Sequence, residues 1–379
     1  MRISISATNP CHLFAMACEL ARADAFGAYY SGYPRWKLGD APGLTVREHS
    51  LRTNVVYGLL KFLPEKLRPS SRSLFLWQDH GFDRWVGAHL ETCDFIHAMP
   101  GQCLETFRAA RRLGVHTVLN HATGPVREWV RIMEPEYRRV GLRLDEACPY
   151  DAAYFAREDQ EYALSDRHCA ASTIVRDQLM AGGIAREKIW VVPYGAEERL
   201  FFPDGSPPPK EFRIVFAGQV GLRKGLKTLL DALSLAGRES WRVDFYGAVL
   251  GEARADLAAY RGRTQLEFHG PVSQAQLGDA FRRSSVLVLP SLEEGFGLVV
   301  PQALSCGVPC IVSDQVGAKD LIQRGENGSI VPVRDTSALA AELAWWSENP
   351  RRLTDTWRWP EPARRLLGLS SAAMEGAGT

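Results

Sequence analysis

The chain has 379 residues, of which 46% are hydrophobic and 23% are charged, and its formal net charge is +1. This composition is typical of globular proteins and excludes a disordered chain, a collagen-like fibre and a coiled-coil array. The near-zero net charge argues against a protein that binds nucleic acid through a broad basic surface. At roughly 100–200 residues per domain, the length favours two domains.

The eight cysteines form neither a CxxC pair nor the spacing of a zinc site, so we expect reduced thiols. In the first 23 residues, MRISISATNPCHLFAMACELARA, polar residues and Pro10 interrupt any apolar core, which predicts a strand and a helix instead of a signal segment. No window of about 18 apolar residues occurs. We therefore expect a cytoplasmic protein, with peripheral contact at the inner membrane face as an open alternative.

Short β-type runs alternate with stretches of helical spacing along the chain, and this alternation predicts parallel sheets built from βα units. In the first half, the clearest strands are expected at residues 3–7, 94–98, 117–120 and 189–192. A helix is expected over residues 102–113, because Leu104, Phe107 and Ala110 fall on one face, and Gly114 marks its end. Residues 33–90 have weak periodicity, and their pattern predicts no boundaries.

A second alternating series follows the first. Its strands are expected at residues 214–217, 243–246, 266–268, 286–289 and 310–312. Between the two series, the segment VVPYGAEERLFFPDGSPPPKEF is rich in proline and glycine, which break regular elements. We therefore predict a first domain at 1–196, a second domain at 197–355 and a tail at 356–379. Two doubly wound domains in succession leave a cleft at the carboxyl ends of their strands, where function is expected.

The stretch VLVLPSLEEGFGLVVPQALSCGVPCIVS, residues 286–313, predicts a strand, a loop, a short helix and a second strand. Its loop carries two glycines, and Pro301 fits only near the first turn of the following helix. Backbone N–H groups at a helix start are unpaired within the helix and can bind phosphate. A Gly-x-Gly loop alone is more often an ordinary βα turn, and the third glycine of a dinucleotide-binding fingerprint is absent.

The stretch FAGQVGLRKGLKTLLDAL, residues 216–233, predicts a strand that leads through a loop into an amphipathic helix. Arg223 and Lys224 lie at the end of this loop, where two cations can neutralise a diphosphate. The spacing of a Walker loop is missing, so ATP hydrolysis is disfavoured.

Together these two stretches resemble the retaining GT-B glycosyltransferases of glycosyltransferase family 4. The likeness extends to SDRHCAASTIVRDQLMAGGIAREKIWVVPYGAE at residues 165–197 and fades before residue 90. The resemblance implies an α/β GT-B fold, in which two Rossmann-like doubly wound domains face each other across a cleft. It also implies transfer of a sugar from a UDP-, GDP- or ADP-sugar to a saccharide, lipid-linked or small-molecule acceptor, with retention and without a separate cofactor.

The resemblance also assigns site residues. Arg223 and Lys224 match the pair that holds the donor diphosphate, and Glu294 matches the acid that contacts the transferred sugar. The implied donor-binding set is Gly218, Arg223, Lys224, Gly295, Phe296, Gly297, Leu298 and Gln302. His121 matches a histidine that many relatives direct at the reacting sugar or acceptor, and a structural role for it is equally consistent with the pattern.

Two positions depart from the family pattern. Gln302 stands where relatives carry the second acid of their E-x7-E motif, and Gln219 stands where many carry another cation. An amide still donates and accepts hydrogen bonds but gives up the charge-assisted bond. Two alternatives therefore stay open: a non-catalytic protein that binds sugar nucleotides, and an enzyme of another class on the same architecture, such as a sugar-nucleotide epimerase or a phosphorylase.

The last two expectations concern metal and the tail. The Asp-x-Asp pattern that carries a nucleotide-bound metal in other glycosyltransferases is absent, so no metal is expected. The tail TWRWPEPARRLL resembles a shortened last helix that crosses back onto the first domain, and Pro360 and Pro362 argue against a long helix. The tryptophans and arginines of this tail form an alternative membrane-surface patch.

Overall fold

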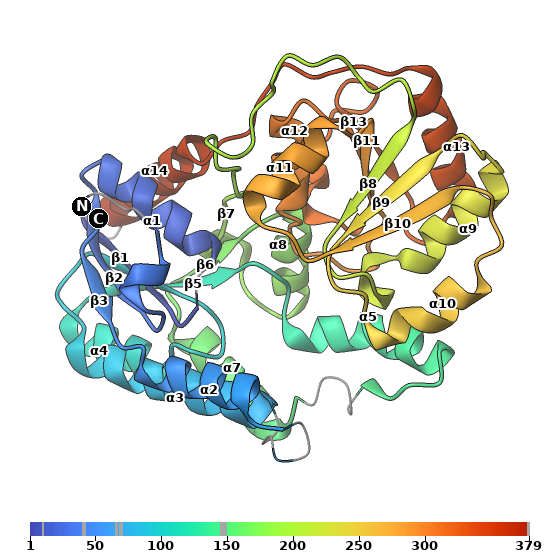
Figure 1. Ribbon diagram of the computed structural model, residues 1–379. Coiled ribbons are helices and arrows are strands. Elements are labelled where there is room, and N and C mark those ends of the chain that lie inside the picture. Colours follow the sequence, from blue (N-terminus) through green and yellow to red (C-terminus); the bar gives the residue numbers. More distant parts are fainter. Residues whose placement is uncertain (10, 40–42, 65–66, 68–70, 145–149, 377–379) are drawn as a thin grey trace.

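The computed structural model describes the whole chain except residues 10, 40–42, 65–66, 68–70, 145–149 and 377–379. Two parallel β-sheets, each packed with helices, lie side by side (Figure 1). The first sheet has the strand order β3-β2-β1-β4-β5-β6-β7 and the second β10-β9-β8-β11-β12-β13. This order, which runs outward in both directions from the first strand, defines two doubly wound Rossmann-like domains. The α/β fold class predicted from the alternating pattern is confirmed.

The first domain contains seven strands. They are β1 (Ile3–Ala7), β2 (Phe26–Ser31), β3 (Val46–Glu48), β4 (Phe95–Ala98), β5 (His116–His121), β6 (Arg167–Ala170) and β7 (Ile189–Val191). Its α-helices are α1 (His12–Arg22), α2 (Leu51–Phe62), α3 (Ser71–His89), α4 (Leu104–Leu113), α5 (Val126–Arg139), α7 (Ala152–Leu164) and α8 (Thr173–Ala181), and η1 (Arg35–Lys37) is a 3-10 turn. Residues 33–90, for which the sequence predicted no element boundaries, thus include β3, α2 and α3.

The second domain contains six strands. They are β8 (Arg213–Ala217), β9 (Arg242–Tyr246), β10 (Gln265–Gly270), β11 (Val286–Leu289), β12 (Cys310–Ser313) and β13 (Gly328–Val331). Its helices are α9 (Leu226–Ala236), α10 (Arg254–Ala259), α11 (Gln274–Arg282), α12 (Val299–Ser305) and α13 (Thr336–Glu348), with 3-10 turns η4 (Leu222–Lys224) and η6 (Gly317–Leu321). All residues of β11 are buried, as expected for a central parallel strand covered on both faces.

Helix α5 belongs to the first domain but packs against the second. Met133 and Tyr137 share a hydrophobic cluster with Leu222 and Leu292 of the second domain. Two ion pairs fasten the outer end of α5, Arg139 to Asp256 at 3.2 Å and Glu136 to Arg334 at 2.9 Å. Figure 1 shows α5 below the second domain, so this helix bridges the two halves of the molecule.

The tail differs from its predicted form. The chain returns to the first domain as α14 (Pro360–Gly376), a 17-residue helix that packs against α1. Both prolines lie in the first turn, where a missing N–H costs no helical hydrogen bond, so the argument against a long helix was wrong. The membrane-patch alternative for the tail is also wrong, because Trp359 is only 7% exposed and Trp357 donates its Nε1–H to the Tyr194 carbonyl at 2.7 Å.

Among the described residues, no helix is both long enough and apolar enough to cross a membrane. The cysteines that the structure describes are all free thiols.

Candidate active site

The two predicted motifs meet at one point of the second sheet. Strands β8 and β11 are neighbours there, and the strand order reverses between them. The loop after β8 leads to η4, and the loop after β11 leads to α12. In open parallel sheets, ligands bind at such a reversal, in the crevice beyond the carboxyl ends of the strands. The topology therefore places both loops at the expected position for a ligand.

Four charged side chains from these loops form one cluster. Arg223 contacts the Glu294 carboxylate at 3.0 Å and the Glu293 carboxylate at 3.4 Å, and it also donates to the Glu293 carbonyl at 3.1 Å. Lys224 donates from Nζ to the same Glu294 oxygen, Oε2, that Arg223 contacts. Glu293 and Lys224 are buried, and Glu294 exposes 12% of its side chain. The cluster thus balances two cations against two acids in a largely dry site.

The two acids of the cluster differ in pKa. Burial would raise the pKa of Glu294, but the charges of Lys224 and Arg223 outweigh it and leave this pKa below its ordinary value. For Glu293, burial dominates and raises the pKa against the opposing charge of Arg223. Glu294 is consequently the stronger acid of the two, and its carboxylate contacts both cations. Glu293 was missed by the sequence reasoning, although its position beside Glu294 was a signal for it.

The loops approach each other so closely that glycine is required. Gly225 has φ +70°, and a Cβ there would lie 1.9 Å from the carbonyl oxygen of Pro290 in the opposite loop. Gly218 has φ +125°, and a Cβ there would lie 3.2 Å from Cε of Lys224. The Lys224 stem thus passes over a glycine at the end of β8, which fixes the position of its ammonium group.

Gly295 brings the first domain onto the glycine loop. A Cβ on Gly295 would lie 2.3 Å from the carbonyl oxygen of Ala122, which follows β5. Ser172 donates its hydroxyl to the Gly295 carbonyl at 2.6 Å, and Thr173 binds Asp320 of η6 through its N–H at 2.8 Å and its hydroxyl at 2.7 Å. The two domains are therefore closed over this loop. Sequence reasoning missed the contacts of Ser172 and Thr173, because they join segments far apart in the chain.

The remaining residues of the glycine loop are Phe296, Gly297 and Leu298. The Phe296 ring is buried against Tyr194, with a 5.0 Å centroid distance, so the side chain of Phe296 holds the loop in place. Gly297 has φ +93°, and Leu298 is partly exposed as the residue that precedes α12.

Gln302 lies on the second turn of α12 and is partly exposed. Its Nε2 donates to Oε1 of Gln274, the first residue of α11, at 2.9 Å. The side chain therefore points toward the loop that precedes α11. Gln219 is exposed.

His121 lies apart from the charged cluster. It ends β5, is 1% exposed, and its Nε2 lies 3.0 Å from Nδ1 of His168. Burial, followed by the nearby His168, lowers the pKa of His121 well below its ordinary value, so the ring is neutral. Its present contacts are those of a core residue, and a catalytic role for His121 stays a prediction.

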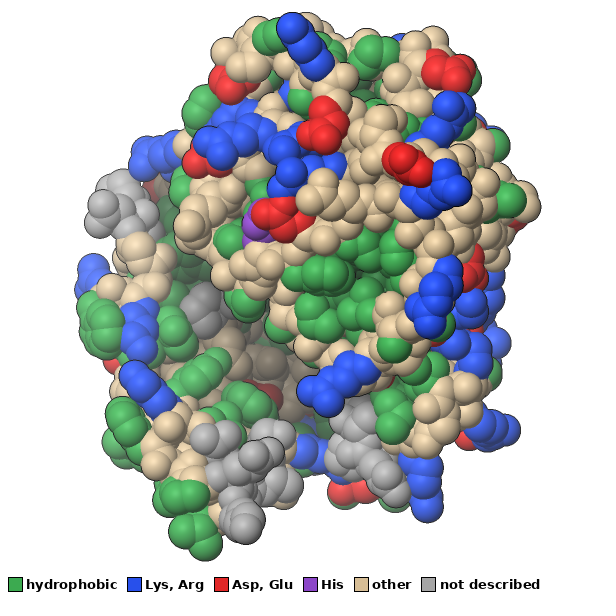
Figure 2. All heavy atoms as spheres, turned by 45° about the vertical axis from the view of Figure 1, so that its right-hand side comes forward, with side chains coloured by type: hydrophobic (Ala, Val, Ile, Leu, Met, Phe, Trp, Pro, Cys, Tyr) green, Lys and Arg blue, Asp and Glu red, His purple; other side chains and the backbone are tan. Residues whose placement is uncertain are grey.

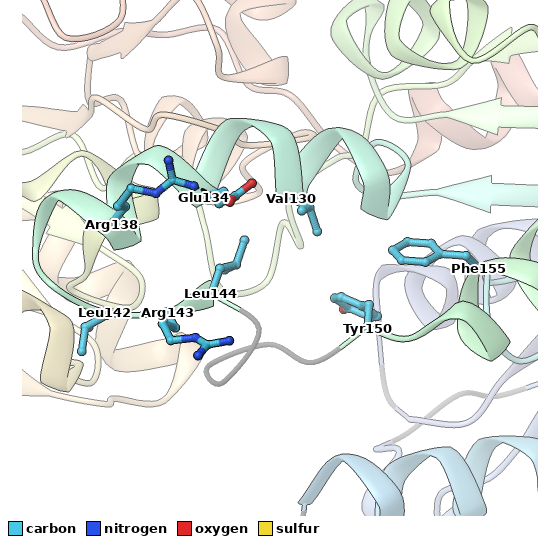
Figure 3. A pocket seen from close by; sticks show the side chains of 8 residues that line it. All are labelled: Val130, Glu134, Arg138, Leu142, Arg143, Leu144, Tyr150 and Phe155. Atoms are coloured by element: carbon cyan, nitrogen blue, oxygen red, sulfur yellow. Dashed lines mark hydrogen bonds and ion pairs between the residues drawn. The ribbon is translucent and has the colours of Figure 1, made fainter.

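Figure 3 shows a pocket of about 460 Å³ on the face of α5 that Val130, Glu134 and Arg138 line. Across the pocket lie Tyr150 and Phe155, which belong to or adjoin α7. Residues 145–149, between Leu144 and Tyr150, are outside the described part of the chain, so we assign this pocket no role.

One group of potential metal ligands occurs among the described residues, Asp244, Glu267 and His269. His269 pairs with Asp244 at 2.8 Å, and Arg242 forms ion pairs with both carboxylates. The arginine supplies the positive charge that an ion would otherwise bring, so these residues form an ion-pair network on β9 and β10.

The fold and the position of the site define the class of protein. Across 99% of this chain and all of the other, the structure resembles sucrose-phosphate synthase from Thermosynechococcus elongatus, with a TM-score of 0.65 and 18% identity. It resembles the Anabaena protein HepE in complex with UDP and glucose over the full length of both chains, with a TM-score of 0.63 and 15% identity. At such identities these likenesses concern the fold, which is GT-B as predicted.

The sequence comparisons narrow the class. Residues 198–359, which include all six strands of the second sheet, match the family described as glycosyl transferases group 1. D-inositol 3-phosphate glycosyltransferase 1 from Catenulispora acidiphila is 30% identical over 258 residues, which are 59% of this chain and 61% of that protein. The D-inositol 3-phosphate glycosyltransferase from Streptomyces coelicolor is 31% identical over 276 residues, which cover 61% of this chain and 60% of that protein. The match thus spans about 60% of the length of these curated relatives.

Proposed function

We propose that this chain is a retaining glycosyltransferase of family 4 that moves a sugar from a nucleoside diphosphate donor to an acceptor hydroxyl. The observation that carries the proposal is the cluster of Arg223, Lys224 and Glu294 at the reversal point of the second sheet. Two cations side by side suit a diphosphate, and the flanking glycine loop lets that group approach the backbone. The match of residues 198–359 to the family described as glycosyl transferases group 1 supports the same conclusion.

The chemistry is stabilisation of the leaving group. In the structure the Glu294 carboxylate is paired with both Arg223 and Lys224. A bound diphosphate takes over these two cations, which frees the Glu294 carboxylate to accept hydrogen bonds from the transferred sugar. As the glycosidic bond breaks, negative charge grows on the diphosphate, and prepositioned cations in a water-poor site stabilise that charge. Because Arg223 and Lys224 already supply the positive charge that a metal ion would bring, we propose that the reaction needs no metal.

The acceptor binds on the side of the first domain. The closed contact between Ser172 and the Gly295 carbonyl places that domain directly over the glycine loop. An acceptor hydroxyl then attacks from the face that the diphosphate leaves, and this route retains the configuration of the sugar. We propose a UDP-sugar as the first donor to test, because the HepE structure holds UDP and glucose. The acceptor is a saccharide, a lipid-linked sugar or a small molecule.

The specific observation behind a second candidate, a protein that binds sugar nucleotides without transfer, is Gln302. It occupies the position of an acid in the family motif and pairs with another amide, Gln274. The intact cluster of Arg223, Lys224 and Glu294 favours the transferase.

The test has two steps. A thermal-shift screen of UDP, GDP, ADP and their sugars identifies the donor, because a ligand at 100 times its Kd stabilises a protein by roughly 2.7 kcal/mol. Release of the nucleoside diphosphate is then measured with the donor alone and with a panel of acceptors. Acceptor-dependent release supports the transferase, binding without release supports the second candidate, and no stabilisation by any nucleotide contradicts both.

A further inference from the structure

Helix α5 is amphipathic, and its apolar side packs on the second domain. At about 100° per residue, Trp129, Met133 and Tyr137 fall within about 80° of one another on the helix. Met133 is fully buried and Tyr137 is 8% exposed, in a hydrophobic cluster that includes residues of the second domain. Arg131 and Arg138 lie on the opposite side and are exposed. Burial of the apolar stripe therefore attaches this helix of the first domain to the second domain.

The buried second-domain members of this cluster are Leu222 and Leu292. Leu222 directly precedes the two cations of the charged cluster, and Leu292 directly precedes its two acids. The N–H of Leu292 donates to the carbonyl of Arg223 at 2.8 Å, so a backbone hydrogen bond sets the register of the two loops at this point. Helix α5 also contacts η4 itself. It thus covers both loops of the donor site beside their charged groups.

The turn η4 depends on such packing. It has three residues, and short 3-10 turns have poorer hydrogen-bond geometry than an α-helix. If α5 left the second domain, Leu222 and Leu292 would lose their apolar cover and become exposed to water. A shift of Leu222 would also move the neighbouring Arg223 and Lys224, because these residues belong to the same turn.

The two ends of α5 are fastened to different domains. Near its start, Arg127 donates two hydrogen bonds, of 2.7 and 2.9 Å, to the carboxylate of Asp159 in α7 of the first domain. At its end, Arg139 donates two hydrogen bonds, of 3.3 and 3.2 Å, to Asp256 of the second domain. The ion pair of Glu136 adds another link to the second domain.

These links act at short range. Figure 2 brings the side of the second domain forward and shows acidic and basic side chains interspersed on that face. A surface of mixed charge exerts little attraction over long distances, and salt screens what there is. The attachment of α5 therefore depends on its buried stripe and on these individual ion pairs.

We propose that α5 is a positioning element of the donor site, with Met133 and Tyr137 acting through the two leucines beside the charged groups. The inference rests on the proposed function, in which the cations of the cluster bind a diphosphate. Charges that are already ordered bind a ligand more tightly than charges that must first be ordered. The affinity of the second domain for a diphosphate consequently depends on a helix of the first domain.

The first test needs no ligand. Hydrogen exchange followed by mass spectrometry reports how firmly the backbone of residues 222–225 and 292–294 is held. Met133→Ala should speed exchange in both segments, because it removes a side chain that covers them. The matched control is Leu343→Ala, which shortens an equally buried side chain of α13 in a separate hydrophobic cluster of the second domain. The control should leave exchange in both segments unchanged.

The second test measures the affinities for UDP and uridine by calorimetric titration. Met133→Ala should weaken UDP binding by about tenfold, roughly the loss of one hydrogen bond to a charged group, and leave uridine binding unchanged. Met133→Leu keeps an apolar side chain of similar volume, so it should restore wild-type affinity for UDP. Leu343→Ala should bind UDP like the wild type.

A surface variant keeps the test decisive if Met133→Ala does not fold. Glu136→Gln/Arg139→Gln leaves the hydrophobic cluster intact and removes the ion pairs of these two residues with the second domain. It should speed exchange in the same two segments and weaken UDP binding by about threefold at low salt, since ion pairs of this kind contribute up to about 1 kcal/mol. At high salt its affinity should equal that of the wild type, because the ion pairs are screened.

Unchanged exchange in both α5 variants would overturn the proposal, as would equal losses of UDP affinity in Met133→Ala and Leu343→Ala. Equal losses for UDP and uridine in Met133→Ala would overturn it too, because the effect would then not concern the diphosphate. Faster exchange in Met133→Ala, together with no UDP binding by the wild type, would support the role of α5 in holding the loops and contradict the proposed function instead.

Discussion

The two domains share one topology and differ in the chemistry at their reversal points. In the second domain, the loops after β8 and β11 bring Arg223, Lys224, Glu293 and Glu294 together. Neutral groups meet at the equivalent place in the first domain, beyond β1 and β4: both the N–H and the hydroxyl of Thr8 donate to Gln102 Oε1, at 2.8 and 2.7 Å.

The amide cluster of the first domain continues into α3. Gln78 is fully buried and donates from Nε2 to Asn9 Oδ1 at 3.3 Å, while its own Oε1 has no hydrogen-bond partner among the described residues. Amides and hydroxyls suit a neutral ligand rich in hydroxyls, and paired cations suit an anion. The same topology thus carries a charged cluster, which we propose binds a diphosphate, in one domain and a neutral amide cluster, which we infer suits an acceptor, in the other.

The largest effect is expected from a change at Glu294, which should alter the rate of transfer and the affinity for UDP in different ways. Glu294→Ala should lower the rate of transfer by two orders of magnitude or more, because its contact with the sugar strengthens in the transition state. UDP affinity should stay level or rise, since Arg223 and Lys224 lose a competing carboxylate. Steady-state kinetics and calorimetric titration with UDP measure the two effects. Transfer within a few-fold of the wild type would remove Glu294 from the catalytic site.

The second prediction tests whether the charged crevice binds the diphosphate. Replacing both cations, as Arg223→Gln/Lys224→Met, should weaken UDP binding by about 100-fold, because a hydrogen bond to a charged group contributes about 1.5–3 kcal/mol. Uridine, which lacks phosphate, should bind this variant and the wild type alike. Equal losses for UDP and uridine would mean that these side chains do not contact the diphosphate.

The third prediction concerns the neutral crevice. Burial raises the pKa of Asp79, which lies beside Thr8, to about 7. Between about pH 4 and pH 7 the folded protein therefore keeps a proton that the unfolded chain has lost, so Asp79 makes stability fall as the pH rises through this window. Asp79→Asn removes that loss.

We expect Asp79→Asn to be more stable than the wild type at pH 8 by up to about 4 kcal/mol, since a pKa change of about three units is worth that much, and to match it at pH 4. Chemical denaturation at both pH values measures the difference. A difference of the same size at pH 4 and pH 8 would show that Asp79 does not titrate in this window and that the first-domain crevice is less dry than we infer.

The second domain was easier to predict from the sequence than the first. The run Val286–Leu289 is uniformly apolar because β11 is covered on both faces, and its glycine loop has a recognisable spacing. In the region 33–90, α2 turns Leu51 and Phe62 outward, so its apolar pattern does not follow the core and the helix was not recognised. The ring pair of His121 and His168 joins two strands 47 residues apart, which no local pattern reveals.

The smallest expected effect concerns Gln302, the main departure from the family motif. If its amide contacts the ribose of the donor, Gln302→Glu should change donor affinity by only about 1 kcal/mol, since a neutral hydrogen bond is replaced by a charge-assisted one. In the structure Gln302 donates to Gln274, so both side chains must reorient before Gln302 can contact the ribose. Gln274→Ala should therefore tighten donor binding slightly, while Gln302→Ala should weaken it.

Comparing the ribonucleotide with its 2′-deoxy analogue tests the contact directly. The wild type should prefer the ribonucleotide, and Gln302→Ala should abolish the preference while leaving the diphosphate contribution of Arg223 and Lys224 intact. If the wild type does not distinguish the two nucleotides and Gln302→Ala changes neither affinity, Gln302 does not contact the ribose. The amide pair of Gln302 and Gln274 would then be a packing feature of α11 and α12, and the donor crevice would consist of the charged cluster and the glycine loop alone.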